Sequence, residues 1–229
     1  MKYSIQAKNL HKTFQTPEKI VILEGVDIEA SLGEAICIMG ASGEGKTTLL
    51  HILGTLEKAD IGEIDIVEKS IKKWSPHILR NEHIGFIFQS YNLLEDLSAL
   101  ENVLMPARIG RKSLSKESPM YQRGLHLLNE VGLQNRQDYP VKLLSGGEKQ
   151  RIAIARALCN NPEIILADEP SGNLDYANSS KIHELLLYFV KKMNKTLILV
   201  THDKELAKLC DRIYLLKRGK ITLVDKHSI

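Results

Sequence analysis

The feature that most constrains this chain is a glycine-rich segment that ends in lysine and threonine. Residues 40–47 read Gly-Ala-Ser-Gly-Glu-Gly-Lys-Thr and fit the pattern G-x-x-x-x-G-K-[ST]. The apolar run Ile36–Met39 precedes this segment, and a run typical of a helix follows it. A strand, a glycine loop and a helix in this order indicate an α/β fold with the loop at the carboxyl end of the strand.

The chemistry expected at this loop is the binding of nucleotide phosphates. Backbone N–H groups curl around phosphate oxygens, and the N-terminal end of the next helix adds positive potential. We expect Lys46 to reach the terminal phosphates, Thr47 to place its hydroxyl on Mg²⁺ and Thr48 to bind phosphate. Glu44 is unusual in an anion-binding loop, and we expect its side chain to point away. The predicted nucleotide-binding residues are Gly40, Ala41, Ser42, Gly43, Glu44, Gly45, Lys46, Thr47 and Thr48.

Further short apolar runs favour a buried, mainly parallel sheet. They lie at residues 84–88, 164–167 and 197–200, between longer helical patterns. The first 30 residues alternate between apolar and polar, which predicts an antiparallel sheet with one wet face. Residues 212–224 have the pattern of a closing hairpin.

The middle of the chain lacks such runs and predicts helices. Ser98 begins a capping box with Glu101, and Ser118 is an N-cap followed by proline. We therefore expect one domain over residues 1–229, with a helical subdomain at 90–159 inserted into a core formed by 1–89 and 160–229.

Composition excludes several classes of protein. Hydrophobic residues are 43% and charged residues 26%, as in ordinary globular proteins. The longest apolar runs are a few residues, whereas a membrane-spanning helix needs about 20. The start of the chain lacks an apolar signal region, and the three cysteines lie far apart, as in a cytoplasmic protein with reduced thiols. The net charge of +3 is too small to indicate nucleic-acid binding.

Polar residues follow three of the apolar runs. Asp168 is placed to hold Mg²⁺, through water, and Glu169 to polarise water for attack on a γ-phosphate. His202 either contacts the γ-phosphate or positions the water with Glu169, although a lone histidine at a strand end is more often structural. Gln89 follows the run 84–88, where its amide would sense the metal or the water, a weak signal by itself.

A second glycine-rich helix start lies at residues 144–151, which read Leu-Ser-Gly-Gly-Glu-Lys-Gln-Arg. The simple interpretation is an N-cap serine followed by a flexible turn. However, one nucleotide does not need two phosphate cradles from one chain. Two cradles make sense if Ser145, Gly146, Gly147 and Glu148 face a nucleotide held by another subunit.

Together these motifs resemble those of the ATP-binding cassette (ABC) ATPases, over nearly the whole chain. Residues 40–47 match the Walker A loop, Gln89 the Q-loop, 144–150 the signature motif and 164–169 Walker B. Residues 172–175, ending in Asp175, match the D-loop, and His202 matches the switch histidine. The resemblance implies ATP and Mg²⁺ as ligands, with Thr47, Gln89 and Asp168 around the metal and Glu169, His202 and Gln89 in catalysis. Phe14 is the residue that would stack on adenine, where the family usually has tyrosine.

The resemblance also implies partners and a location. Residues 86–94, 97–106 and 167–175 are similar to a subgroup that includes lipoprotein-releasing, macrolide-export and cell-division ATPases. We expect a homodimer on the cytoplasmic face of the inner membrane that powers a separate permease, with lipoprotein release the first choice. The exposed part of residues 89–108 is expected to dock that permease. The alternatives are a cell-division relative or a soluble ABC clamp outside transport, for which the chain shows no coiled-coil, metal or tandem-cassette addition.

Overall fold

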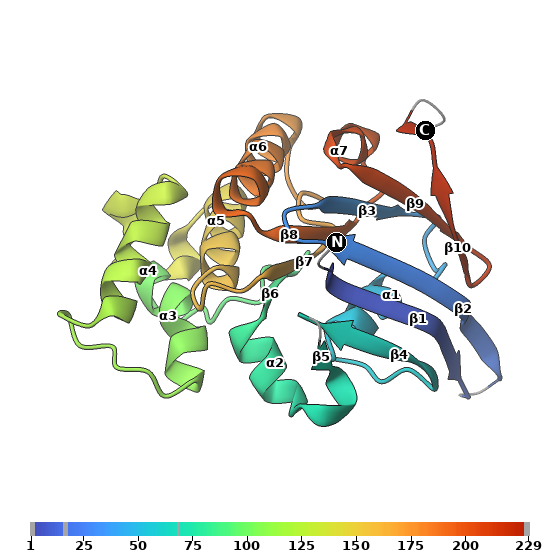
Figure 1. The fold of residues 1–229 in the computed structure, drawn as a ribbon. Helices are drawn as coiled ribbons and strands as arrows, with labels where there is room; N and C mark the ends of the chain where they lie inside the picture. Colours follow the sequence, from blue (N-terminus) through green and yellow to red (C-terminus); the bar gives the residue numbers. More distant parts are fainter. Residues whose placement is uncertain (1–2, 16–17, 68, 227–229) are drawn as a thin grey trace.

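A six-stranded sheet with the order β10-β9-β3-β8-β7-β6 carries most of the predicted strands (Figure 1). The computed structural model describes residues 3–15, 18–67 and 69–226. Strands β9 to β6 run parallel, and β10 pairs antiparallel with β9, which confirms the buried parallel sheet and the closing hairpin. The bounds are β3 (Ala35–Met39), β6 (Ile84–Ile87), β7 (Ile164–Asp168), β8 (Thr196–Val200), β9 (Arg212–Lys217) and β10 (Lys220–Val224).

A separate antiparallel sheet has the order β2-β1-β4-β5. Its strands are β1 (Tyr3–Phe14), β2 (Ile20–Ser31), β4 (Ile61–Ile66) and β5 (Lys69–Ser70). The antiparallel pairing of β1 and β2 confirms the interpretation of their alternating sequence. Strands β4 and β5 were not predicted. β4 alternates only weakly, and its pairing with β1 brings together residues far apart in the chain.

Helices surround the six-stranded sheet and form one end of the molecule (Figure 1). The predicted capping box at Ser98 and the serine–proline start at Ser118 are both present. Short 3₁₀ turns lie at Ile71–Lys73, Gln134–Arg136 and Val141–Leu143. The helices are α1 (Lys46–Leu53), α2 (Pro76–Glu82), α3 (Ala99–Ile109), α4 (Pro119–Glu130), α5 (Gly146–Ala157), α6 (Tyr176–Met193) and α7 (Lys204–Leu209).

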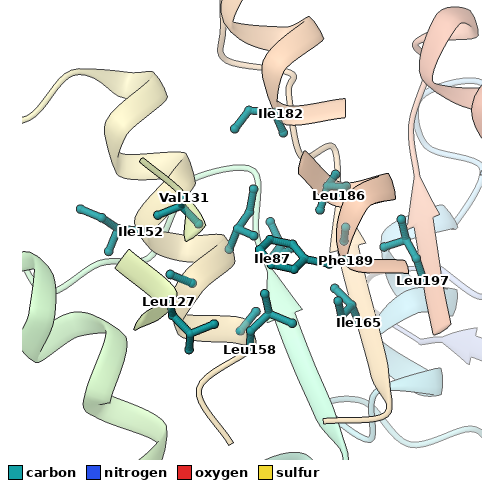
Figure 2. Packing of buried hydrophobic residues seen from close by; sticks show 14 of the residues in the cluster. Ile87, Leu127, Val131, Ile152, Leu158, Ile165, Ile182, Leu186, Phe189 and Leu197 are labelled. Carbon is teal, nitrogen blue, oxygen red and sulfur yellow. The ribbon is translucent and has the colours of Figure 1, made fainter. Parts of the chain in front are cut away.

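Each face of the six-stranded sheet packs against its own hydrophobic cluster. Along β8, Leu197 and Leu199 face the cluster that includes the helices α3 to α6, whereas Ile198 and Val200 face α1 and the antiparallel sheet. Figure 2 shows the first cluster, in which Phe189 of α6 is fully buried beside the sheet. Burial on both faces explains the continuous apolar runs in the sequence. The cysteines of the described chain are buried and unpaired.

The parallel strands bring the polar residues that follow them to one edge. β3 leads into residues 40–47, β6 is followed by Gln89, β7 ends at Asp168 and β8 is followed by Thr201. Because these strands are parallel neighbours, their carboxyl ends meet, which is where α/β sheets bind ligands. Within the described ranges, no helix combines the length and apolarity needed to cross a bilayer.

Candidate functional site

A cavity of about 530 Å³ lies at this edge of the sheet. Most of its lining comes from segments that the sequence had singled out: the glycine loop, the start of α1, the end of β7 and the residues that follow β6, β7 and β8. The described lining residues are Ile22, Gly40, Ser42, Gly43, Gly45, Lys46, Thr47, Thr48, Gln89, Asp168, Glu169 and His202. Of these, only Ile22 was not predicted, because a residue of a half-exposed antiparallel strand carries no motif.

The glycines of the loop are required by backbone geometry and by space. Gly43 and Gly45 have φ values of 84° and 93°, a region that favours glycine. A Cβ atom on Gly40 would lie 2.5 Å from the carbonyl oxygen of Leu216, and one on Gly45 would lie 2.5 Å from Ile22 Cγ2. The backbone can therefore curl tightly at the N-terminus of α1, leaving the N–H groups there for a ligand.

Two charged side chains of the loop have defined partners. The Lys46 ammonium donates to the carbonyl oxygens of Gly40 and Ala41, each at 2.9 Å, so it lies over the loop. The Glu44 carboxylate accepts a hydrogen bond from the backbone N–H of Arg218, in the turn between β9 and β10. The expectation that Glu44 points away from the phosphates is confirmed, because the β-turn holds its negative charge.

Thr47 and Asp168 form the part of the cavity that suits a cation. Thr47 Oγ1 donates to Asp168 Oδ1 at 3.2 Å, so the two oxygens are close enough to belong to one coordination shell. Burial raises the pKa of the Asp168 carboxyl, and the hydrogen bond from Thr47 opposes that rise. A divalent cation would favour the ionised form. Hydroxyl and carboxylate oxygens, completed by phosphates and water, fit Mg²⁺ rather than a softer metal.

Glu169 and His202 lie side by side at the cavity wall. The Glu169 Oε1 atom lies 2.9 Å from His202 Nδ1, and the Glu169 side chain is only 15% exposed. Gln89 also lines the cavity, and its carbonyl oxygen accepts a hydrogen bond from the Asn173 side chain at 2.9 Å. A carboxylate and an imidazole that face a phosphate cradle can accept a proton from water and orient it.

The second glycine-rich helix start, at residues 144–151, lies outside the lining of the cavity and has side-chain caps that the start of α1 lacks. Among the described residues that line the cavity, none comes from 145–148. Ser145 caps α5 and forms a capping box with Glu148, whose carboxylate also contacts Arg136 at 3.2 Å. The backbone N–H and the hydroxyl of Ser145, together with Arg136, lower the pKa of Glu148. Asp175 caps α6 and accepts from the backbone N–H of Asn178 at 2.9 Å.

The contacts of two residues, Thr201 beside the cavity and Arg156 outside its lining, were not foreseen from the sequence. The Thr201 hydroxyl donates to Glu169 Oε2 at 2.9 Å, and Arg156 donates to the carbonyl oxygens of Tyr91, at 2.7 Å, and Asn92. The position of Thr201 directly before His202 was the one available signal. Phe14, in contrast, is absent from the described lining; it is 40% exposed at the end of β1, with the Lys12 ammonium 5.0 Å from its ring centroid.

Comparison with known proteins gives the family. The family model described as ABC transporter matches residues 23–172. The chain belongs to the ABC transporter family. It is therefore an ATPase of this family, in which ATP hydrolysis drives transport.

Two lipoprotein-releasing relatives match this chain along nearly their whole length. The lipoprotein-releasing system ATP-binding protein LolD of Protochlamydia amoebophila (strain UWE25) is 55% identical over 215 residues, 94% of each chain. The LolD protein of Pseudoalteromonas translucida (strain TAC 125) is 42% identical over 98% of this chain and 97% of its own.

Solved structures of ATP-binding cassettes have the same fold. The cassette MJ0796, in a dimeric post-hydrolysis state bound to ADP and phosphate, superposes with a TM-score of 0.87 at 37% identity, covering 97% of this chain and 98% of that one. The α/β fold expected from the sequence, with a mainly parallel sheet, an antiparallel β part and added helices, is thereby confirmed. The cavity brings together the residues of one chain that resemble Walker A, the Q-loop, Walker B and the switch histidine.

Proposed function

We propose that this chain is the ATP-hydrolysing subunit of a transporter that releases lipoproteins from the inner membrane. The observation that carries the proposal is the 55% identity to a lipoprotein-releasing ATP-binding protein over 94% of both chains. In this role the chain binds at the cytoplasmic face of the membrane and powers a separate permease.

Within one chain, the cavity residues divide into phosphate, metal and water ligands. Lys46, Thr48 and the loop N–H groups of residues 40–47 hold the phosphates of ATP. Thr47, Asp168 and Gln89 would hold Mg²⁺, which would neutralise charge on the phosphates. Their shared position at one cavity wall supports this division.

Glu169 and His202 act on the attacking water. Glu169 is the proposed general base, and His202, 2.9 Å from it, supports the charge that develops on the γ-phosphate. Phe14 would stack on adenine, since its ring is exposed and can offer a face to a base.

A second chain completes each ATP site in the proposal. The N-terminus of α5, with Ser145, Gly146, Gly147 and Glu148, would face the γ-phosphate of ATP held by the partner chain, and Asp175 would lie at the same interface. The separation of residues 145–148 from the phosphate cavity of their own chain supports a head-to-tail homodimer. The solved cassette MJ0796, itself described as dimeric, is consistent with this arrangement.

A largely apolar groove of about 390 Å³ is the proposed docking site of the permease. Phe88, Met105, Pro106 and Ile109 contribute to its lining, and Phe88 directly precedes Gln89. Its apolar surface overlaps the region of residues 89–108 expected from the sequence to dock a membrane subunit.

Arg156 ties this groove to the segment that follows Gln89. It lines the groove and donates to the carbonyl oxygens of Tyr91 and Asn92, which have left-handed φ values of 59° and 50°. Burial lowers the pKa of Arg156 to about 10, so the guanidinium stays charged at neutral pH. A shift of Gln89 at the nucleotide would thereby reach the groove.

The experiment that tests the proposal is co-purification from membranes with identification of the bound permease. The expected result is a lipoprotein-releasing permease whose recovery falls with Leu94→Glu or Ile109→Glu. Both side chains are exposed; Ile109 lines the groove, and Leu94 lies two residues after Asn92, which also lines it. Leu223→Glu, a charge at an exposed leucine on β10, is the matched control. Leu93 packs against the larger core and is a poorer probe. Recovery of a division-linked partner, or of no membrane protein, would contradict lipoprotein release.

A further inference from the structure

The backbone at Glu169 is held in an uncommon conformation directly after β7. Glu169 has a φ of 45°, in the left-handed region that non-glycine residues seldom adopt. Its N–H donates to the carbonyl oxygen of Val200 at 2.9 Å, which ties it to the end of β8. The residues that follow β8 are therefore the natural partners of the Glu169 side chain.

Both oxygens of the Glu169 carboxylate have partners on the segment after β8. Oε1 lies 2.9 Å from His202 Nδ1, and Oε2 accepts from Thr201 Oγ1 at 2.9 Å. The two partners differ in exposure. The His202 side chain is 74% exposed and lines the phosphate cavity, whereas Thr201 is 1% exposed and is not among the described residues lining that cavity.

The direction of the Thr201 hydroxyl follows from its neighbours. The backbone N–H of Asp203 donates to Thr201 Oγ1 at 3.0 Å, so at this contact the hydroxyl oxygen is the acceptor. An ionised carboxylate only accepts hydrogen bonds. The Thr201 hydroxyl proton is therefore directed to Glu169 Oε2. The Thr201 backbone N–H donates to the carbonyl oxygen of Ile38 in β3, which fixes the backbone of Thr201 against the sheet.

We propose that Thr201 is a positioning residue for ATP hydrolysis. Its hydroxyl holds Glu169 Oε2 and fixes the rotation of the carboxylate. Oε1, beside His202, is left as the oxygen that faces the cavity and accepts the proton of the attacking water. This inference rests on the proposed role of Glu169 as the base, and it adds the residue that selects which carboxylate oxygen acts.

A second buried threonine, at the start of β8, provides a matched control. Thr196 is fully buried, and its hydroxyl donates to the carbonyl oxygen of Ser31 at 2.9 Å, away from the phosphate cavity. Thr196→Val and Thr201→Val both remove a buried hydroxyl at nearly constant volume. A purely structural role predicts similar effects of the two substitutions on stability and on turnover.

The test compares steady-state ATP hydrolysis, nucleotide affinity and thermal stability of the full chain. Thr201→Val is expected to lower kcat by about 10- to 100-fold, the usual cost of a misplaced catalytic group, with KM and nucleotide affinity within about twofold. Thr201→Ser, which keeps the hydroxyl, should return kcat to within about threefold of the wild type. Thr196→Val should change kcat by less than about twofold, whatever its effect on the melting temperature. If Thr201→Val does not fold, Thr201→Ala removes the same donor and takes its place.

A double variant separates this proposal from that for Glu169. With Glu169→Gln already present, Thr201→Val should cause little further loss of kcat, because the base it positions is gone. Equal losses in both backgrounds, or an unchanged kcat in Thr201→Val, would overturn the role of Thr201. Full turnover by Glu169→Gln alone would instead overturn the choice of base.

Discussion

The starts of α1 and α5 are both glycine-rich, but they are completed in different ways. α1 has no side-chain cap, a left-handed glycine at the N-cap position and no acidic residue in its first turn. α5 is capped by Ser145 and has Glu148 in its first turn. A helix N-terminus attracts anions through its unpaired N–H groups and its dipole. The start of α1 leaves those groups for a ligand, whereas α5 satisfies part of them with its own side chains.

Because α1 is uncapped and α5 is capped by its own side chains, the two helix starts differ in how readily they can bind an anion. The first helical residue of α1 is Lys46, a cation that joins the phosphate cradle. At α5, the Glu148 carboxylate accepts hydrogen bonds from the Ser145 N–H and from Arg136. Side chains of the same chain therefore satisfy part of the hydrogen-bonding groups at this helix end. In the proposed function, α1 therefore provides the primary phosphate site, and α5 would add a weaker contact to the nucleotide of a partner chain.

The largest expected effect is at the cradle of α1. Lys46→Ala should weaken nucleotide binding and abolish turnover, because the cradle loses its charged donor. Lys204→Ala is the control, since Lys204 also begins a helix but lies at α7, whose N-cap is Asp203. ATP titration and phosphate release measure both variants. An unchanged activity of Lys46→Ala would remove the primary role given to α1.

Glu169→Gln should separate binding from hydrolysis at the same cavity. Nucleotide affinity should be kept, while kcat falls by about 10²–10⁴-fold, the typical contribution of a general base. The neutral amide keeps the size of the side chain, so the hydrogen bond from Thr201 can still form. Single-turnover hydrolysis beside equilibrium binding gives the comparison, and equal losses in both would place Glu169 among the nucleotide ligands.

Mixing two defective chains tests whether α5 serves a partner. Lys46→Ala disables the cradle, and Ser145→Arg blocks the start of α5 while leaving its own cradle intact. A mixed dimer then has one site with an intact cradle and an intact α5, and one doubly defective site. ATP-dependent dimerisation, measured by light scattering, should appear only in the mixture, with some hydrolysis. Full activity of Ser145→Arg alone, as a monomer, would contradict the shared site.

The side-chain cap of α5 should contribute more to the free energy of unfolding than the serine of the phosphate loop before α1. Ser145→Ala is expected to lower the free energy of unfolding by about 1 kcal/mol, since the helix loses a side-chain cap. Ser42→Ala, at the loop before α1, should change it by less than about 0.5 kcal/mol, as α1 has no side-chain cap to lose. Urea unfolding of both variants measures the contrast, and equal losses would show that the two helix starts are stabilised alike.

The smallest expected effect is a pH dependence of the free energy of unfolding that comes from Glu148 at the start of α5. The Ser145 N–H and hydroxyl and Arg136 lower the pKa of Glu148. The resulting stability is fully present above the unfolded value of about 4.3 and is lost as pH falls through the lowered pKa. Wild type and Glu148→Gln should thus differ by less than about 1 kcal/mol at neutral pH and converge in acid. In a Ser145→Ala background the difference at neutral pH should be smaller, because Glu148 loses the hydrogen bond from the Ser145 hydroxyl.

Much of the site was evident from short stretches of sequence. The glycine loop at residues 40–47 lies between the apolar strand β3 and the helix α1, so local sequence alone predicts it. Strands buried on both faces can be recognised in the sequence as continuous apolar runs. Gln89, Asp168 and His202 come after such runs, and they lie close together because the carboxyl ends of parallel strands meet at one edge of the sheet. Family membership and these positions therefore needed no coordinates.

Contacts between distant segments were decided only by the tertiary structure. The bond of the Thr201 hydroxyl to Glu169 depends on the pairing of β7 with β8, and that of Arg156 to Tyr91 on the packing of α5 against the segment after β6. The Glu44 carboxylate accepts a hydrogen bond from the backbone N–H of Arg218, which is 174 residues away in the sequence. No local pattern encodes such partners, because polar side chains pair with whatever donor or acceptor the packed backbone brings within about 3 Å. The sequence by itself determined the phosphate loop and the buried, mainly parallel strands, whereas the packing determined the order of the strands in each sheet and which atoms hold Glu169 in place.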